Sequence, residues 1–509
     1  MTKAALPRLC LDTLGADLTA SLDAIRADLA SPIGRVARSR QLVEAALADG
    51  HAHYGLNTGF GALKSQRIPE GDVAQLQINV LRSHACGVGE PVDRNITRRM
   101  VALKAYALGL GHSGVSPIVV ERLLDFLDRD VIPVVPSQGS LGASGDLAPL
   151  SHLALPLIGE GYVWSDDGPI PAADVLRQLA LAPVALGAKD GLALINGTQF
   201  MAAHAVEVVL RGRQLAETAD MVAAMTVEAM RGSSRPFDAR VAEVRAHPGH
   251  AASAARVRQM LEGSEIGPSH LHCDRVQDPY SIRCVPQVHG ASRDALAYVA
   301  GAVETEINSV TDNPLVFDAD GAPDLISGGN FHGQPLALAM DFAAIALAEW
   351  ASISERRIYL LLDGCDGLPP FLINGSGLQS GFMIPQYVAA ALVSENKTLC
   401  HPASVDSIPS SRGQEDHVSM GAWGARKALQ VVENAEQVLA IEALCAAQAL
   451  DVRHPMKAGR GVEAAWDAIR QRVAFRDTDR LFQDELAAVT DLVRTGRLAE
   501  ILRILPIRS

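Results

Sequence analysis

Residues 139–150, GSLGASGDLAPL, have glycine at every third position, with Ser144 placed between Ala143 and Gly145. Glycines at this spacing favour a tight turn or a close approach of the backbone to another group. The stretch does not match the hydrolase motif G-x-S-x-G, because Asp146 stands where the second glycine is needed. It also lacks the G-x-G-x-x-G spacing of a dinucleotide loop and the lysine of a phosphate-binding loop. Two interpretations remain, a plain surface turn and chemistry of the backbone itself.

Backbone chemistry is available to Ala143-Ser144-Gly145. Gly145 has no side chain to obstruct its amide nitrogen in an attack on the carbonyl carbon of Ala143. Closing that ring and removing water from Ser144 gives a 4-methylidene-imidazol-5-one, which is an electrophile made from the backbone. Such a group can capture an amine and improve its departure, a form of covalent catalysis.

The stretch closely resembles the signature of the aromatic amino acid ammonia-lyases, and the resemblance covers nearly the whole chain. It implies that Ala143-Ser144-Gly145 cyclises autocatalytically to that prosthetic group, and that the chemistry needs neither metal nor nucleotide. Within the family, the motifs are most similar to the members that convert L-histidine to trans-urocanate and ammonia, the first step of histidine degradation. The other matching stretches are YGLNTGFGALKS (54–65), RSHACGVGEP (82–91), GLALINGTQ (191–199), RVQDPYSIRC (275–284), ISGGNFHGQP (326–335), SGFMIPQ (380–386) and QEDHVSMG (414–421).

The reaction needs a base for the β-proton of the substrate, because that hydrogen is barely acidic. The resemblance implies that this base is Tyr54, in the glycine-flanked loop 54–61, or less readily Tyr280, and it leaves Glu415 open as an alternative. A tyrosine ionised near pH 7 needs a pKa lowered by about three units from about 10. We expect nearby positive charge and helix N-termini directed at the site to lower it.

Further residues are implied to bind the substrate. Arg283 matches the family's carboxylate-binding arginine, whose planar fork suits bidentate binding. Asn196 and Gln277 match amide residues that line the site, as partners for the substrate's carboxylate or amine and for the prosthetic group's carbonyl. Phe331 matches an aromatic wall of the pocket.

The choice of substrate is implied to depend on His84 and Glu415, which match the residues that face the imidazole in the histidine-specific members. A neutral imidazole has one donor and one acceptor, so a carboxylate at 415 can accept from the ring and help to move a proton. The phenylalanine and tyrosine enzymes typically carry glutamine where Glu415 aligns. Arg412-Gly413 departs from the common Ala-Asn, and this departure affects the expected shape of the loop.

Two other functions are compatible with parts of the pattern. A phenylalanine or tyrosine ammonia-lyase, or an aminomutase that returns ammonia to the β-carbon, would use the same prosthetic group, but Glu415 and the run QEDHVSMG argue against both. A helical scaffold that has lost catalysis is the third hypothesis. It predicts substitutions at Ser144, Tyr54 or Arg283, whereas all three residues are present.

One competing motif is SHLHC, residues 269–273, in which two histidines and Cys273 suggest a zinc site. Neighbours this close cannot easily all face one metal, and Cys284 lies too far along the chain for a zinc knuckle. We therefore expect no metal.

Long helices are expected to position these motifs. Apolar residues spaced by three and four from Leu296 to Val310 form one stripe along a helix, which stops at Asp312-Asn313-Pro314. Ser116-Pro117 begins another helix with an N-cap followed by proline. Stretches 201–231, 335–362 and 416–449 are also predicted to be helical.

The chain is therefore predicted to be mainly α. A loop-rich N-terminal part, 1–200, carries the Ala-Ser-Gly loop, and a long-helix bundle body with the C-terminal helices spans 201–509. Helices this long indicate a bundle or an oligomer in which helices of several subunits pack together. The resemblance implies the aspartase/fumarase-like superfamily and a homotetramer whose active sites are completed by several subunits.

Composition narrows the setting of the protein. Hydrophobic residues make up 48% of the 509 residues and aromatic residues only 4%, which suits helices better than sheets. A net charge of −13 argues against nucleic acid as a partner. Seven scattered cysteines without a CxxC pair are typical of reduced thiols. Without a signal peptide or a membrane-length apolar run, we expect a cytoplasmic enzyme of a small molecule, with no membrane partner.

Overall fold

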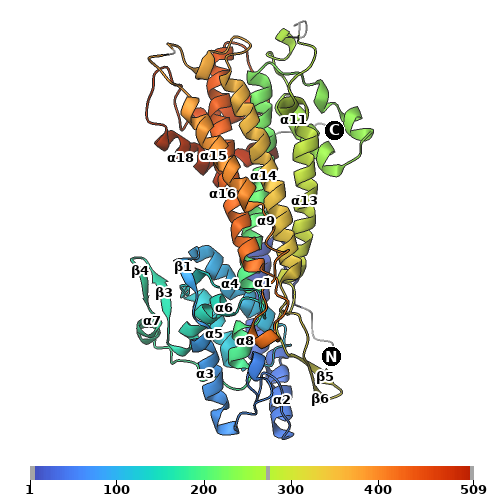
Figure 1. Cartoon of the computed structure of the whole chain (residues 1–509), viewed down its shortest axis with the longest axis vertical. Coiled ribbons are helices and arrows are strands. Elements are labelled where there is room, and N and C mark those ends of the chain that lie inside the picture. Colours follow the sequence, from blue (N-terminus) through green and yellow to red (C-terminus); the bar gives the residue numbers. More distant parts are fainter. Residues whose placement is uncertain (1–5, 271–274, 376, 505–509) are drawn as a thin grey trace. The chain divides into compact units, whose positions relative to one another are not determined.

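The computed structural model describes residues 6–270, 275–375 and 377–504. These residues fold mainly into α-helices joined by loops and short hairpins (Figure 1). The predicted fold class, mainly α with a long-helix bundle, is confirmed.

The chain forms two compact units, and each is assembled from three separate segments. Unit 1 contains Met1–Glu207, Ala300–Met340 and Pro402–Arg426, and unit 2 contains Val208–Val299, Asp341–His401 and Lys427–Ser509. The sequence predicts one division, between residues 200 and 201, whereas the chain crosses between the two units several times. The division into 1–200 and 201–509 stays a prediction.

Unit 1 is built from short helices around an apolar core. The helix that the sequence predicts after Ser116, α5, begins at Pro117 with Ser116 as N-cap, and its Val120, Leu124 and Leu127 are buried. Proline at the first helical turn removes no hydrogen bond, which is why the helix can begin there. The helices that lie in this unit are α1 (Leu14–Leu29), α2 (Arg35–Ala48), α3 (Val73–His84), α4 (Arg94–Gly109), α5 (Pro117–Asp128), α6 (Leu147–Ala154), α7 (Ala172–Gln178) and α8 (Asp190–Ile195).

Three antiparallel sheets of two strands each complete the described part of unit 1. The first of them joins the segment after α3 to the segment before α6, because Val88 pairs with Gln138 and Pro91 with Pro136. The strands are β1 (Val88–Pro91) with β2 (Pro136–Gln138), β3 (Tyr162–Ser165) with β4 (Gly168–Pro171), and β5 (Leu315–Ala319) with β6 (Ala322–Ile326).

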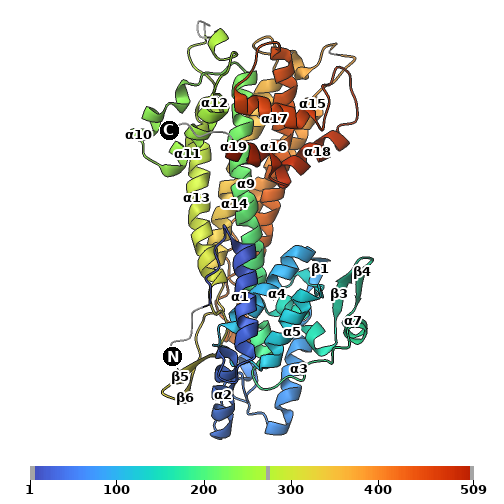
Figure 2. The same ribbon diagram turned by 180° about the vertical axis from the view of Figure 1, so that it is seen from behind.

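Unit 2 is a helical bundle. Figure 1 and Figure 2, which show opposite sides, both place the unit 2 portions of four long helices side by side. These helices are α9 (Gln199–Ala229), α13 (Val285–Ile307), α14 (Gln334–Leu362) and α16 (Gly421–Arg453). Many of their buried residues are alanines, and small side chains let helix backbones approach closely. The other helices of this unit are α10 (Ala239–Glu243), α11 (Pro248–Met260), α12 (Tyr280–Arg283), α15 (Met383–Leu399), α17 (Arg460–Arg470), α18 (Gln483–Arg494) and α19 (Arg497–Ile504).

The predicted long helices agree with α9, α14 and α16, with two differences at helix ends. Helix α16 begins at Gly421 rather than at 416, and Met420 before it has a φ of +53°, outside the right-handed helical region. Helix α13 ends at Ile307, so Val310 lies beyond it, although Leu296 and Ile307 are buried as the apolar stripe predicts.

Buried ion pairs connect the helices of the bundle. Arg357 on α14 donates from Nε and Nη2 to the two carboxylate oxygens of Glu442 on α16, at 2.6 and 2.8 Å, and both side chains are fully buried. Thr226 on α9 donates its hydroxyl to the same carboxylate at 2.6 Å. Because each partner would be unpaired and buried without the others, this cluster fixes the register of three helices.

Helix α14 is long and apolar enough to cross a membrane by length and composition, and it is the one such helix within the described residues. Of its most apolar window, 67% is buried inside the protein. That burial is typical of the core helix of a helical bundle.

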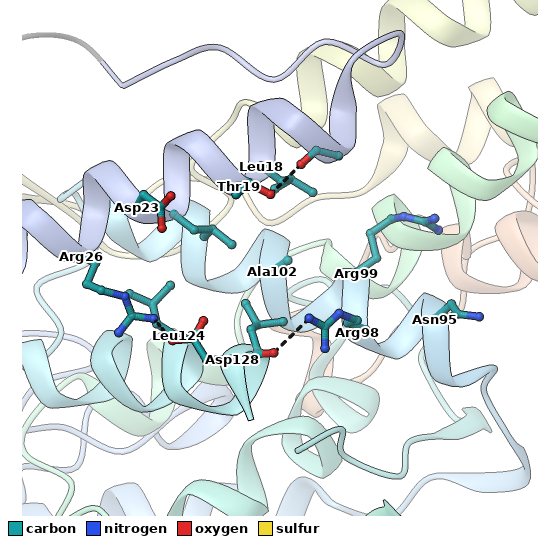
Figure 3. A pocket seen from close by; sticks show the side chains of 13 residues that line it. Leu18, Thr19, Asp23, Arg26, Asn95, Arg98, Arg99, Ala102, Leu124 and Asp128 are labelled. Atoms are coloured by element: carbon teal, nitrogen blue, oxygen red, sulfur yellow. Dashed lines mark hydrogen bonds and ion pairs between the residues drawn. The ribbon is translucent and has the colours of Figure 1, made fainter. Parts of the chain in front are cut away.

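A cavity of about 560 Å³ in unit 1 lies between α1, α4 and α5 (Figure 3). Its arginines are bonded within the protein: Arg26 to Asp128, Arg98 to the carbonyl of Leu127 at 3.0 Å, and Arg99 to Glu207. None of the predicted site residues lines this cavity.

Candidate active site

The Ala-Ser-Gly loop runs from β2 to α6 as a tight turn. Gly142 and Gly145 pair with one another across the turn, and both have a positive φ, of +80° and +78°. Ser144 lies between them with a φ of +53°, a left-handed conformation that a side chain rarely adopts. A Cβ atom on Gly145 would lie 2.1 Å from the carbonyl oxygen of Gly197, so glycine is required there.

The carbonyl oxygen of Ser144 accepts two hydrogen bonds from one neighbouring segment. Asn196 donates from its side-chain nitrogen at 3.3 Å, and Gly197 donates its backbone N–H at 3.4 Å. The side-chain oxygen of Asn196 is buried without a hydrogen-bond partner. A turn folded back on itself, two donors on the serine carbonyl and an unpartnered amide oxygen together fit a prosthetic group formed from Ala143-Ser144-Gly145.

Two cavities in unit 1 share the residues around this loop. The first, of about 510 Å³, is lined by Tyr54, His84, Ser144, Asn196 and Glu415 among others. The second, of about 650 Å³, is also lined by Tyr54, Ser144 and Glu415. Ala143 and Phe331 line the second cavity as well. The predicted site residues of unit 1 therefore gather around Ser144.

Tyr54 lies in the loop after α2, where its hydroxyl oxygen accepts the backbone N–H of Gly61 at 3.4 Å. Burial raises the pKa of Tyr54 above its usual 10.0, the Gly61 hydrogen bond opposes this, and the charge of Glu415 adds to the increase. We expected a lowered pKa for Tyr54, but the described residues of unit 1 raise it. The physical reason is first the burial of the hydroxyl and second the carboxylate charge of Glu415, because both disfavour the phenolate.

His84 is the last residue of α3, and its Nδ1 lies 2.9 Å from the hydroxyl oxygen of Ser83. Burial lowers the pKa of the His84 imidazole below its usual 6.5, and a hydrogen bond to the backbone of Val80 and the charge of Glu415 only partly oppose this. The ring is therefore neutral above that pH, with one nitrogen able to donate and the other able to accept.

Glu415 is held by the loop that precedes it. Ser410 donates its hydroxyl to Glu415 Oε2 at 2.7 Å, and the two residues also pair through their backbones. Ser411, Arg412 and Gly413 all have a positive φ, of +49°, +57° and +83°. Arg412-Gly413, which departs from the family pattern, thus lies in a left-handed turn in which only glycine is free of strain.

The loop before Glu415 contacts the Tyr54 loop. Ser411 accepts the backbone N–H of Ala62 on its hydroxyl oxygen at 3.1 Å. A Cβ atom on Gly61 would lie 2.6 Å from the same oxygen. The close approach at Gly61 therefore lets the two loops that carry Tyr54 and Glu415 meet.

The remaining predicted residues belong to unit 2. Tyr280 and Arg283 are the two ends of α12, and the Arg283 guanidinium lies over the Tyr280 ring at 4.6 Å. Tyr280 is 72% exposed, and the Nε of Arg283 is buried without a partner. Gln277 lines a separate cavity of about 530 Å³ within unit 2. Their part in one site with Ser144 stays a prediction.

The zinc motif falls partly outside the described residues, since these include His270 but neither His272 nor Cys273. Within the described part of the chain, no three His, Cys, Asp or Glu side chains are grouped so that they could hold a metal ion. The described cysteines are free.

Comparison with known proteins identifies the family. The family model of the aromatic amino acid lyases matches residues 23–471. A histidine ammonia-lyase of Sorangium cellulosum is 53% identical, over 91% of this chain and 92% of its own length. A histidine ammonia-lyase of Deinococcus radiodurans is also 53% identical, over 92% of this chain and 89% of its own. The chain belongs to the aromatic amino acid lyase family.

Solved structures of the aromatic amino acid lyase fold agree with this membership. The crystal structure of histidine ammonia-lyase from Trypanosoma cruzi has a TM-score of 0.85 and 42% identity, and covers 94% of this chain and 89% of that one. A tyrosine aminomutase from Streptomyces globisporus has a TM-score of 0.88 and 37% identity, over 96% and 98% of the two chains. The predicted family and the predicted class of enzyme, a carbon–nitrogen lyase, are confirmed.

Sequence reasoning missed three residues that lie beside the predicted site residues of this lyase. Ser410 binds the Glu415 carboxylate, but a serine in a loop gives no signal of its own. His332 and His417 stack with ring centroids 5.8 Å apart and line the second cavity. His332 lies in the motif ISGGNFHGQP and His417 in QEDHVSMG. Because both motifs match the family, their sequence positions could have marked the two histidines as candidates.

Proposed function

We propose that this lyase removes ammonia from L-histidine and releases trans-urocanate, the first step of histidine degradation. The observation that carries the proposal is that His84 and Glu415 line the same cavity as Ser144. A neutral imidazole and a carboxylate can between them donate to and accept from the ring nitrogens of a histidine substrate. The names of the relatives that are 53% identical support the same substrate, which is also the one that the sequence predicts.

The prosthetic group belongs to the same proposal. Ala143, Ser144 and Gly145 are proposed to cyclise autocatalytically to a 4-methylidene-imidazol-5-one, and the fit of the turn supports this. Once formed, this group supplies an electrophile that accepts the substrate's α-amino group and eases its departure. Asn196 and the N–H of Gly197 hold the oxygen of Ser144, where they can stabilise negative charge.

Each end of the substrate has proposed partners. Glu415 keeps Oε1 for the substrate's ring N–H, because Oε2 is bound by Ser410. His84 keeps Nε2 for the ring, because Nδ1 is near Ser83. Phe331 packs against the imidazole, and Arg283 with Gln277 binds the α-carboxylate, for which a planar guanidinium is suited.

Tyr54 is proposed as the base that removes the β-proton. Its hydroxyl oxygen already accepts the N–H of Gly61, a bond that favours the phenolate. Tyr280 and Glu415 are the alternative bases. Glu415 is the stronger of these two, because it lines both cavities together with Ser144.

A second candidate activity is an aminomutase or a lyase of phenylalanine or tyrosine. The tyrosine aminomutase that covers 96% of this chain favours it, since the two proteins share one fold and many residues. Glu415 argues against phenylalanine, because the ring of phenylalanine offers the carboxylate no hydrogen-bond donor. The product distinguishes these activities, because an aminomutase returns a β-amino acid.

The proposed assembly is a homotetramer in the cytoplasm, with no metal, nucleic acid or membrane partner. Long helices of unit 2 expose large apolar side chains, among them Tyr298 on α13 and Phe342 and Ile345 on α14. A row of such residues on a bundle is typical of a surface that another subunit covers. Light scattering on the purified protein tests the tetramer.

The first experiment is ultraviolet detection of urocanate after the purified protein is mixed with L-histidine. Phenylalanine and tyrosine are run in parallel, and Ser144→Ala is the control. Urocanate from histidine alone, abolished in Ser144→Ala, is the expected result. Cinnamate or coumarate from the other two amino acids would overturn the proposed selectivity, and a β-amino acid would replace the lyase by an aminomutase.

A further inference from the structure

A buried lysine lies directly behind the segment that contacts Ser144. Lys104 is in the middle of α4, within the apolar run VALKAYALGL, and only 1% of the residue is exposed. Its Nζ donates to the carbonyl oxygens of Ala193, at 3.1 Å, and Asn196, at 2.7 Å. These two carbonyls lie at the C-terminal end of α8, where an ammonium group is favourable because it meets the negative end of the helix dipole.

The Asn196–Gly197 peptide connects this lysine to Ser144. Its carbonyl oxygen is bound by Lys104, and its N–H, on Gly197, donates to the carbonyl oxygen of Ser144 at 3.4 Å. A hydrogen bond donated to the oxygen of a peptide group polarises that group and makes its N–H a stronger donor. The same contact also fixes the backbone of Asn196, whose side-chain amide is the second donor to Ser144.

At neutral pH both the ammonium and the neutral amine of Lys104 are present, and either form can donate to the two carbonyl oxygens. Burial and the charge of Lys189 lower the pKa of Lys104, while the charges of Asp312 and Asp146 raise it, and the result is about 7. Lys189 is bound to Asp312 at 2.7 Å, so the second lysine has its own partner. Asp146 follows the Ala-Ser-Gly turn directly, and its backbone N–H donates to the carbonyl of Gly197 at 2.8 Å.

We propose that Lys104 is a positioning residue for the Ala143-Ser144-Gly145 loop, which acts by directing the N–H of Gly197 and the amide of Asn196 at the carbonyl oxygen of Ser144. This inference rests on the proposed function, in which Ser144 loses water. It adds a residue that contacts neither substrate nor prosthetic group and acts through one peptide bond.

The loss of water from Ser144 shows why those donors matter. The Cα proton and the Cβ hydroxyl leave together as one water molecule, and a Cα=Cβ double bond forms. The electron pair of the Cα–H bond moves toward the neighbouring carbonyl first, so negative charge develops on the oxygen of Ser144. Donors already aimed at that oxygen stabilise the charge without reorganisation. Lys104 holds the Asn196–Gly197 peptide so that these donors stay directed at the carbonyl oxygen of Ser144.

The test measures maturation of the chain directly by intact mass. A matured chain is two water molecules lighter than its sequence, and its fraction is followed over time after a short pulse of synthesis. Removing a direct donor of this kind slows a reaction by about 10²–10³-fold, so loss of a residue that only directs the donors is expected to slow maturation about tenfold in Lys104→Met. Lys104→Arg, which keeps the charge and the donors, is expected to restore most of the rate.

Lys427→Met is the matched control. Lys427 is equally buried at 1%, is paired with Asp341 and donates to the carbonyl of His401, but it lies in unit 2. We expect Lys427→Met to lower stability and to leave the rate of maturation unchanged. Equal maturation rates in wild type, Lys104→Met and Lys427→Met would overturn the role of Lys104. A wild-type chain that never loses two waters would overturn the prosthetic group instead.

A second readout does not depend on maturation or on activity. In a Ser144→Ala background, hydrogen exchange at the amide of Gly197 reports whether its N–H is held. Lys104→Met is expected to speed this exchange about tenfold, a factor that equals a loss of about 1.4 kcal/mol, whereas Lys427→Met leaves it unchanged. If Lys104→Met does not fold, Lys104→Gln replaces it, since glutamine removes the charge, shortens the side chain and keeps a polar amide. Unchanged exchange in the folded variant would refute the positioning role.

Discussion

Ser410 and Glu415 are joined by three hydrogen bonds. The Ser410 hydroxyl donates to Glu415 Oε2 at 2.7 Å, the Ser410 N–H donates to the Glu415 carbonyl at 2.9 Å, and the Glu415 N–H donates back at 3.4 Å. The backbone pair closes the loop, and the hydroxyl fixes the direction of the carboxylate. Glu415 can therefore present its other oxygen, Oε1, to a ligand in the cavity that His84 and Ser144 also line.

Ser410→Ala is predicted to raise the KM for histidine about tenfold with a smaller effect on kcat. The reason is that a hydrogen bond to a charged group contributes about 1.5–3 kcal/mol, and the freed carboxylate no longer points at the substrate ring. Steady-state kinetics of urocanate formation measure this. Ser309→Ala is the control, because that hydroxyl only donates to the carbonyl of Thr305. An unchanged KM in Ser410→Ala would show that Glu415 needs no orientation.

The activity is predicted to rise with pH through the neutral and alkaline range. Burial and Glu415 raise the pKa of Tyr54, so the phenolate fraction grows about tenfold per pH unit until the pH reaches that raised pKa. If Tyr54 is the base, kcat/KM follows this fraction. Removing the charge in Glu415→Gln takes away one cause of the increase, and the pKa of Tyr54 then falls.

The titration of Tyr54 measures this separately from activity. The phenolate absorbance of wild type minus that of Tyr54→Phe gives the curve of this one tyrosine, and the same subtraction is made in the Glu415→Gln background. We expect the second curve to lie at lower pH. A curve that stays in place or moves to higher pH contradicts the electrostatic coupling of the two residues.

The helices could be predicted from sequence because their apolar residues repeat with the helical period. Leu296 and Ile307 are buried on α13 as that period requires. The two compact units could not be predicted, because α9, α13, α14 and α16 each contribute residues to both units. The helical period continues through the residue where such a helix passes from one unit to the other, so the sequence pattern does not reveal the boundary.

Tyr54, His84 and Glu415, which the motifs single out, line one cavity with Ser144. The roles of these residues, and a site shared with Tyr280, Gln277 and Arg283, stay predictions. The direction of the Tyr54 pKa could not be predicted, because it depends on burial and on the distance to Glu415. Lys104 gave a sequence signal, a charge inside an apolar run, but its partners are two carbonyls that only the fold brings near.

Gly145→Ala is predicted to abolish the loss of two waters. The new Cβ would lie 2.1 Å from the carbonyl oxygen of Gly197, and the φ of +78° adds strain of about 1–2 kcal/mol. Gly50→Ala is a matched control, because Gly50 has the same φ of +78° and a Cβ atom added there would have no other atom within 4 Å. Intact mass and thermal unfolding of both variants separate the clash from the strain. Normal maturation in Gly145→Ala would show that the turn can move away from Gly197.

Arg357→Met is predicted to destabilise the bundle of unit 2 by about 3–5 kcal/mol, because it leaves the buried Glu442 carboxylate without its bidentate partner. The double variant Arg357→Met, Glu442→Leu is expected to recover most of that loss, since it leaves no unpaired charge. Arg472→Met is the exposed control: Arg472 pairs with Asp491 at 3.1 Å on the surface, and such pairs contribute about 0–1 kcal/mol. Urea unfolding, followed by tryptophan fluorescence, to which the buried Trp350 on α14 contributes, measures all three. If the double variant is no more stable than Arg357→Met, the loss comes from packing around Arg357 rather than from the unpaired charge.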